Sequence, residues 1–409
     1  MNIRKSYTHT KYASYIGYIT QAIINNFSPL LFVYFSSNYS IPLAQISLLV
    51  AINFATQLSV DLIGAAVIDK VGYRPSVVFA HLMSGTGLIL LGVLPRVMPS
   101  PFLGILIATV CSAMGGGLLE VLISPIIEAC PFKNKQSAMS LLHSFYCWGH
   151  LLVVLVSTAF FVLVGIDSWM WLAAIWASVP LLNAIYFALV PITELRAEGS
   201  KKGSFGFLKT SAFWMFTVLM LCAGASELSM AQWVSAFAER GLGVSKTVGD
   251  LAGPCMFALL MGVSRVAHAK ISNKVNAAWY MGACCASCVV GYLLAALAPH
   301  PALGLVGCGI CGLSVGVMWP GTYNMASEIC RGGTAMFALL ALAGDLGCSV
   351  GPSVVGLVAD ANGGELKLGM LAAIVFPIVL ALGLLCLKSK FKSRKAAEKS
   401  ENSDISPEK

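Results

Sequence analysis

Twelve long apolar stretches, separated by short polar segments, limit what this chain can fold into. Each is long enough for a helix that crosses a bilayer, which needs about 20 mostly apolar residues. Hydrophobic residues make up 57% of the 409 residues and charged residues 11%, whereas a soluble protein has about 25% charged residues. The sequence therefore predicts an all-α protein with many membrane spans, and it excludes a soluble enzyme, a nucleic-acid binder and a disordered protein. The predicted spans are 12–35, 46–68, 75–95, 102–129, 137–165, 168–192, 211–237, 247–269, 275–298, 302–328, 333–359 and 367–388.

Lysine and arginine are distributed unequally between the two sides of these spans. Of the 26 Lys and Arg residues, 21 lie on the side of both chain termini and four on the opposite side. Loops rich in positive charge remain in the cytoplasm. We therefore expect both termini to be cytoplasmic, and the formal net charge of +8 to reflect this topology.

A polar segment at 193–210 divides the chain into two sets of six spans. Two six-helix bundles related by a pseudo-two-fold axis are the plan of one large class of secondary transporters, with the substrate site between them near the middle of the membrane. Ser124-Pro125 in the fourth span and Trp319-Pro320 in the tenth occupy matching positions. We expect an N-terminal bundle at 1–192, a cytoplasmic linker at 193–210, a C-terminal bundle at 211–388 and a disordered tail at 389–409.

Most of the 13 cysteines lie inside apolar stretches. The spacings Cys285-x-x-Cys288 and Cys308-x-x-Cys311 match half of a metal site, but no His or carboxylate lies close to either pair in the sequence. Thiols in such surroundings pack as small apolar groups. Neither a metal nor a cofactor is expected.

Ionisable residues inside the spans are the strongest functional candidates, because such a group in a bilayer costs about 2.5 kcal/mol or more. Glu120 follows Gly115-Gly116-Gly117, so neighbouring helices can approach closely around its carboxyl group. Apolar surroundings favour the neutral form of a carboxyl group, which predicts that Glu120 exchanges a proton at physiological pH. The alternative is a carboxyl group that only hydrogen-bonds a neighbouring helix. The other ionisable residues in spans are Asp61, Glu128, Glu227, Asp345, Arg265, His143 and His150.

The fifth span carries polar and aromatic residues on one face. His143 and His150 are seven residues apart, and Tyr146 and Trp148 lie between them. Such a cluster suits a polyol, because hydroxyl groups need directional partners and sugar rings stack on aromatic side chains. The alternative for each histidine is a buried side chain whose hydrogen bonds are satisfied within the protein.

The remaining polar residues leave several roles open. Glu227 needs a partner that Arg265 can supply, either as a structural pair or within a transport site. Asp345 is equally open to a structural role, and Asp61 and Glu128 approach the cytoplasmic ends of their helices. Side-chain amides in the first two spans offer hydrogen bonds to a substrate or between helices: Gln21, Asn25, Asn26, Asn53 and Gln57.

The segment Asp69-Lys70-Val71-Gly72-Tyr73-Arg74, at the cytoplasmic end of the second span, resembles the loop motif of the major facilitator superfamily. The resemblance implies that an acid, a glycine turn and basic residues join spans two and three and hold the outward-open state. Asp69, Gly72 and Arg74 would then be gating residues. The sequence departs from the pattern twice, because Ala65 replaces the first glycine and the equivalent loop at 269–274 lacks the acid.

Three further segments resemble the fucose–galactose–glucose:proton symporters of that superfamily, namely Gly117 to Pro125, Leu142 to Gly149 and Glu227 to Trp233. The first-span acid of the fucose symporters would fall near Pro29, where this chain has no acid. Three alternatives follow. Glu120 is the only residue that carries the coupled proton, or it shares this role with Asp61 or Glu227, or transport is coupled in another way. We expect the substrate to contact Asn25, Asn26, Gln57, Glu120, His143, Tyr146, Trp233, Trp319 and Asn324.

The sequence favours a secondary active transporter that imports a sugar or a similar small polar metabolite by proton symport, with alternating access. The first alternative is a proton-coupled efflux transporter of hydrophobic compounds, and the second a membrane receptor that transports nothing. Efflux antiporters usually carry Gly-x-x-x-Gly-Pro in span five, whereas this chain has that run in span eleven, at 347–352. No enzymatic activity and no nucleic-acid partner are expected. We expect a monomer in a bacterial inner membrane, with the lipid bilayer, a small substrate and a proton as partners.

Overall fold

The computed structural model of the protein describes residues 3–132, 135–193, 205–271, 275–330 and 333–387. Within these ranges, twelve helices are long and apolar enough to cross a membrane, which confirms the predicted all-α membrane fold. Most of the expected linker at 193–210 and all of the tail at 389–409 lie outside the described residues.

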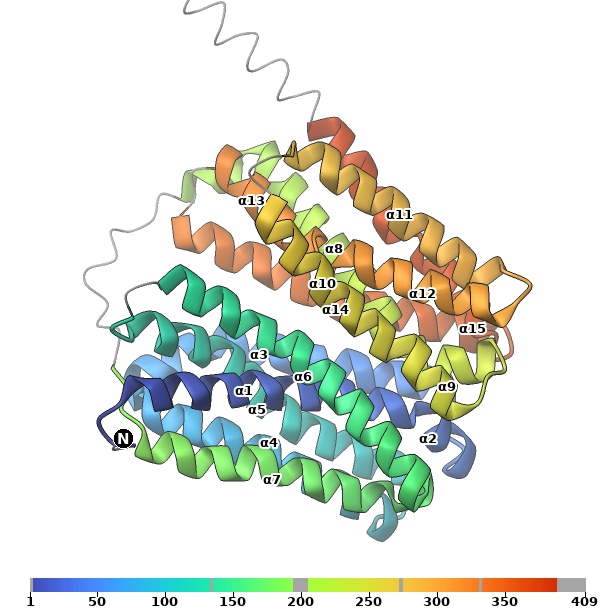
Figure 1. Cartoon of the computed structure of the whole chain (residues 1–409), viewed down its shortest axis with the longest axis horizontal. Coiled ribbons are helices and arrows are strands. Elements are labelled where there is room, and N and C mark those ends of the chain that lie inside the picture. Colours follow the sequence, from blue (N-terminus) through green and yellow to red (C-terminus); the bar gives the residue numbers. More distant parts are fainter. Residues whose placement is uncertain (1–2, 133–134, 194–204, 272–274, 331–332, 388–409) are drawn as a thin grey trace, which may run out of the picture.

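The first six spans form one bundle, coloured from blue to green in Figure 1. Helix α4 packs against α5 and α7, and α1 packs against α6 and α5. Glycines allow the closest approach, since a Cβ atom on Gly87 or Gly115 would collide with the backbone of the neighbouring helix. The elements are α1 (Tyr7–Asn26), η1 (Ser28–Leu31), α2 (Phe32–Asn38), α3 (Leu43–Val71), α4 (Tyr73–Val97), α5 (Pro101–Ala129), α6 (Lys135–Val164), η2 (Ile166–Ser168) and α7 (Trp169–Leu189).

The last six spans form the second bundle, which lies beside the first (Figure 1). Helix α14 packs against α8 in its own half and against α3 of the other half. The last span continues beyond α15 to Leu387. The elements are η3 (Phe205–Lys209), α8 (Ser211–Ala236), η4 (Phe237–Gly241), α9 (Lys246–Asp250), η5 (Leu251–Cys255), α10 (Met256–Ile271), α11 (Ala277–Leu297), α12 (Pro301–Val315), α13 (Met318–Ile329), α14 (Gly333–Ala361) and α15 (Leu366–Ala373).

Because successive spans alternate in direction, the two halves share the same two ends. The terminal end contains Tyr7, where α1 begins, and Ser211, where α8 begins. The far end contains Asn38 and Leu43, which flank the first turn between spans. The distribution of Lys and Arg predicts that the terminal end is cytoplasmic.

The first and tenth spans, which the sequence predicts as unbroken helices, are divided, and a proline explains each of these two divisions. Proline has no N–H group and cannot donate to the carbonyl four residues earlier. Pro29 therefore leaves the Asn25 carbonyl without a helical partner, and α1 ends at Asn26. Pro320 does the same to Gly316, and the tenth span is divided there into α12 and α13.

Hydrogen bonds join the two halves at the far end. Arg240 of η4 donates to the hydroxyl oxygens of Ser36 and Ser37, at 3.0 and 2.8 Å. The backbone N–H of Ala44 donates to Asp360 at 3.2 Å. These contacts cross between the bundles, so the far end is closed.

Candidate functional site

One face of α1 organises the polar centre of the N-terminal bundle. Tyr18, Gln21 and Asn25 lie three and four residues apart, so they share a helix face. The Tyr18 hydroxyl lies 3.1 Å from Nδ1 of His143 and 3.0 Å from the Ser124 hydroxyl. Helix α1 thus fixes side chains from both α5 and α6.

Glu120 is held by a neutral partner and remains accessible to solvent. Nε2 of Gln21 donates to its carboxylate at 2.7 Å. Its side chain is exposed although Glu120 lies well inside a membrane-spanning helix. Asp61 of α3 and Asp345 of α14 interact electrostatically with Glu120, so the three carboxyl groups face the space between the halves. Because solvent reaches this level and the far end is closed, the space opens towards the terminal end.

A cluster of side-chain amides separates these carboxyl groups from the far end. Oδ1 of Asn25 accepts hydrogen bonds from Gln57 at 2.8 Å and from Asn53 at 3.3 Å. Nε2 of Gln232, from the other half, donates to the Asn25 main-chain oxygen at 3.0 Å. All four residues are buried.

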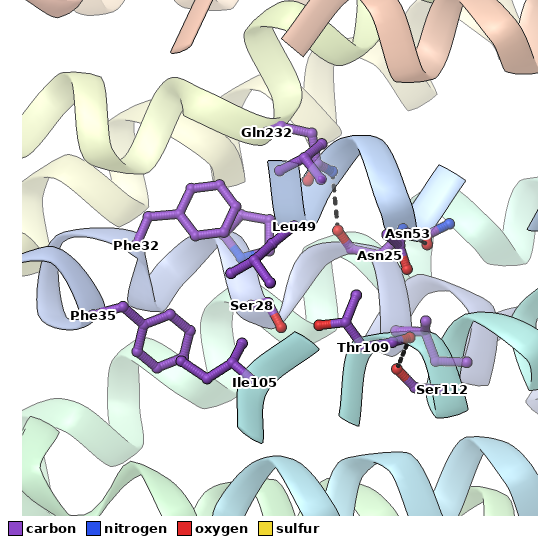
Figure 2. Close-up of a pocket in the computed structure, with 13 residues that line it drawn as sticks. Asn25, Ser28, Phe32, Phe35, Leu49, Asn53, Ile105, Thr109, Ser112 and Gln232 are labelled. Atoms are coloured by element: carbon purple, nitrogen blue, oxygen red, sulfur yellow. Dashed lines mark hydrogen bonds between the residues drawn. The ribbon is translucent and has the colours of Figure 1, made fainter. Parts of the chain in front are cut away.

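The amide cluster borders a small cavity of about 30 Å³, shown in Figure 2, which is lined by the N-terminal half and by Gln232 of the other half. Amide and hydroxyl groups line one side, and the rings of Phe32 and Phe35 line another. No charged side chain is among the residues that line it. The cavity therefore suits water or a neutral polar group. Its lining is Ile24, Asn25, Ser28, Pro29, Phe32, Phe35, Leu49, Val50, Asn53, Ile105, Thr109, Ser112 and Gln232.

The C-terminal half contributes an ion pair and an aromatic wall. Nη2 of Arg265 lies 3.4 Å from Oε2 of Glu227, as the sequence suggested, and Nη1 donates to the Cys147 sulfur of the other half at 3.4 Å. Trp319 lies against Gly344, next to Asp345 in α14, and packs edge-on against Tyr323. The guanidinium group of Arg265 is thus already paired with Glu227.

The structure brings most of the predicted substrate residues to one region between the halves. His143 and Asn324 are exposed, and Tyr146 contacts the amides of Asn25 and Asn26. Trp233 is fully buried instead, and its indole N–H donates to the Pro352 carbonyl at 2.9 Å. Asn25, Asn26 and Gln57 are buried as well, so only part of the predicted set faces the solvent-accessible space.

Of the predicted gating residues, Gly72 and Arg74 are described and the side chain of Asp69 lies outside the described part of the chain. Gly72 has a φ of 92°, which only glycine adopts readily and which allows the tight reversal between α3 and α4. Nη1 of Arg74 donates to the carbonyls of Phe187 and Ala188 at 3.0 and 2.8 Å, and so caps the end of α7 in its own half.

Two residues of this region were missed by the sequence analysis as site residues. Tyr18 looked like one of many aromatic residues in an apolar span, although its spacing of three from Gln21 indicated a shared face. Gln232 was noted only as part of a resembling segment, and its contact with Asn25 depends on the packing of two bundles. Within the described residues, no group of three or more His, Cys, Asp or Glu side chains is arranged to hold a metal ion.

Two six-helix bundles with a polar, solvent-accessible region between them define a secondary transporter. The sequence profile of the Major Facilitator Superfamily matches residues 14–352, and the chain belongs to that family. It is therefore a multi-pass membrane protein of a transporter family rather than an enzyme family. No curated protein matches the sequence significantly.

Several solved structures share the fold. A bacterial homologue of the human lysosomal transporter Spinster, in an inward-facing and occupied conformation, has a TM-score of 0.79 and 16% identity, over 93% of this chain and 97% of the homologue. The nucleoside transporter NupG has a TM-score of 0.75 and 12% identity, over 93% and 98% of the two chains. The E. coli fucose:proton symporter FucP has a TM-score of 0.63 and 14% identity, over 93% and 98%.

Proposed function

We propose that this transporter imports a sugar or a similar small polar metabolite by proton symport, using alternating access. Glu120 is the principal proton-coupling residue, and Asp61 and Glu227 are further candidates. The protein acts as a monomer in a bacterial inner membrane, with its terminal end in the cytoplasm. The proposed gate consists of Asp69, Gly72 and Arg74.

The observation that carries the proposal is the environment of Glu120. Its carboxylate is reached by solvent, lacks a cationic partner among the described residues and accepts a hydrogen bond from neutral Gln21. A carboxyl group in such a place can exist in either protonation state, because no fixed positive charge stabilises the anion. Protonation can therefore change with the side of the membrane to which the space opens.

The groups around Glu120 support a small polar substrate over a hydrophobic one. His143 and Tyr18 present ring nitrogen and hydroxyl groups, and the Asn324 side chain is exposed. Trp319 and Tyr323 offer aromatic faces in the other half. Directional hydrogen bonds together with aromatic faces recognise hydroxylated rings. A fucose:proton symporter and a nucleoside transporter among the similar folds, both of which carry hydroxylated rings, are consistent with this class.

Uptake into proteoliposomes tests the proposal. Labelled hexoses, pentoses and a nucleoside are supplied with and without an inwardly directed proton gradient. We expect one class to accumulate only with the gradient. Glu120→Gln should abolish accumulation but retain exchange of labelled for unlabelled substrate, because the amide keeps the size of the side chain and cannot ionise. Gradient-driven accumulation by the variant at the wild-type level would refute the coupling assignment, and gradient-driven extrusion of hydrophobic dyes would favour the efflux alternative.

A further inference from the structure

We propose that Asp345 is a further coupling residue, and that the terminal end closes only when the negative charge shared by Asp61, Glu120 and Asp345 has been reduced by protonation. The inference rests on the proposed proton coupling and adds to it a residue of the C-terminal half. It also assigns a cause to the coupling, namely repulsion between the halves. The three residues together are named the carboxyl triad.

The carboxyl triad lies at one depth and belongs to both halves. Asp61 is ten residues from the end of α3 at Val71, Glu120 nine from the end of α5 at Ala129, and Asp345 twelve from the start of α14 at Gly333. At about 1.5 Å per residue, all three lie roughly 14 to 18 Å from the terminal end. Asp345 interacts electrostatically with both other members, across the space between the bundles.

The side chains around the triad do not neutralise it. Helix α8 contributes Glu227, which is paired with Arg265 of α10, and α13 contributes Tyr323, which interacts with Asp345 and Glu120. Cys348, one turn from Asp345 on α14, is uncharged as a thiol. Helix α1 contributes the hydroxyl of Tyr18 and the amide of Gln21, and α6 contributes the titratable imidazole of His143, whose Nδ1 lies 3.1 Å from the Tyr18 hydroxyl. None of the described ion pairs includes a member of the triad, and Oδ1 of Asp61 is a buried atom without a hydrogen-bond partner.

Closing the terminal end would change the energy of this arrangement. In the open state water reaches Glu120 and screens the negative charges from one another. Closure removes that water and brings α14 towards α3 and α5, which raises the repulsion between like charges and the cost of desolvating each of them. A proton on a carboxyl group removes both costs. Proton uptake therefore favours closure. It lowers the repulsion between the two halves, because Asp345 belongs to one half and Asp61 and Glu120 belong to the other.

Hydrogen–deuterium exchange of the purified protein in lipid nanodiscs tests this without a substrate. Exchange is followed between pH 5 and 8 and corrected for the intrinsic effect of pH on amide exchange. We expect acid to slow exchange at least several-fold in terminal-end peptides of α5 and α14 and to accelerate it in far-end peptides of α2 and η4. The wild-type transition should take up about two protons.

The variants separate the triad from a general effect of acid. Asp345→Asn should shift the transition to higher pH and lower its steepness to about one proton, whereas Asp345→Glu, which keeps the carboxyl group, should behave like the wild type. Glu365→Gln, which removes an exposed carboxylate at the far end, is the matched control and should change nothing.

Two results would overturn the inference. One is a transition in Asp345→Asn with the wild-type midpoint and steepness. The other is a wild type that does not respond to pH but closes when tetramethylammonium is added at pH 7.5, because the triad would then bind a cationic solute. Failure of the proposed function would be seen in a different measurement: uptake of labelled solute into proteoliposomes would not depend on the proton gradient.

Discussion

Gln232 donates a hydrogen bond of 3.0 Å to the main-chain oxygen of Asn25, the carbonyl that Pro29 deprives of its helical partner. The bond runs from α8 of the C-terminal half to the break in the first span. A carbonyl without a partner costs several kcal/mol in a membrane. The break therefore creates an acceptor that the other half satisfies while the far end is closed.

Gln232→Leu should destabilise the closed far end. Leucine is of similar size but cannot donate, so the Asn25 carbonyl is left without a partner. We expect this to destabilise the closed far end by about 1–3 kcal/mol, which lowers the ratio of closed to open states by about 5- to 150-fold. Hydrogen–deuterium exchange in 32–38 and 237–241 should accelerate. Ser353→Ala serves as the control, because the Ser353 hydroxyl bonds only to Ser349 in its own helix. Equal exchange in Gln232→Leu and the wild type would show that the bond does not stabilise this state.

Tyr18→Phe tests whether the first span orients His143. The change removes the hydroxyl that lies 3.1 Å from the imidazole and 3.0 Å from Ser124, and it leaves the ring in place. We expect substrate affinity to fall by about tenfold, which corresponds to ~1.4 kcal/mol, with little change in melting temperature. His143→Ala should weaken binding at least as much. Isothermal titration with the sugar or nucleoside found by the uptake panel measures both, and unchanged affinity in both would place the site elsewhere.

Gly344→Ala tests the aromatic wall. A Cβ atom at Gly344 would overlap the indole ring of Trp319, so the ring must move. We expect weaker substrate binding by one to two powers of ten (~1.4 kcal/mol per tenfold), as for Trp319→Ala. Gly282→Ala is the matched control, because nothing lies within 4 Å of a Cβ atom at that glycine. If Gly344→Ala binds substrate with wild-type affinity, Trp319 does not belong to the substrate site.

The architecture was predictable from the sequence because the bilayer imposes it. A span needs about 20 apolar residues and must satisfy its own backbone, so apolar runs and their breaks are sufficient to locate twelve helices. The division of the first and tenth spans was missed, although Pro29 and Pro320 were visible. Whether a proline kinks or divides a helix depends on what accepts or supplies the lost hydrogen bond, and here Gln232 supplies it from 207 residues away.

The candidate site was predictable only in part. Glu120 was identified because ionisable side chains inside spans are rare and usually belong to a transport pathway. Its neighbour Gln21 was recognised only as one of several amides that could bond a substrate or another helix. The role of Asp345 stayed open, because neither its depth nor its partners can be deduced from its own helix. The structure brings Asp345 to Glu120 through the packing of α14 against the opposite bundle.

Asp69 is the proposed gate residue at the terminal end. In this terminal-open structure the neighbouring Arg74 is bonded within its own half, to the carboxyl end of α7. A carboxylate at Asp69 can hold basic groups or a helix N-terminus of the other half only when the terminal end is closed. Asp69→Asn should therefore reduce the closed population several-fold without affecting substrate affinity.

Cysteine accessibility measures this shift. The background replaces by serine the native cysteines that are not buried: Cys111, Cys255, Cys284 and Cys386. A reporter at Asn324, exposed near the terminal end, should be labelled faster in Asp69→Asn, and a reporter at Thr109, in the far-end cavity, more slowly. Glu365→Gln should leave both rates unchanged. If Asp69 assists only membrane insertion and loop folding, well-expressed Asp69→Asn will be labelled at both positions as fast as the wild type, because no conformational equilibrium then depends on its charge.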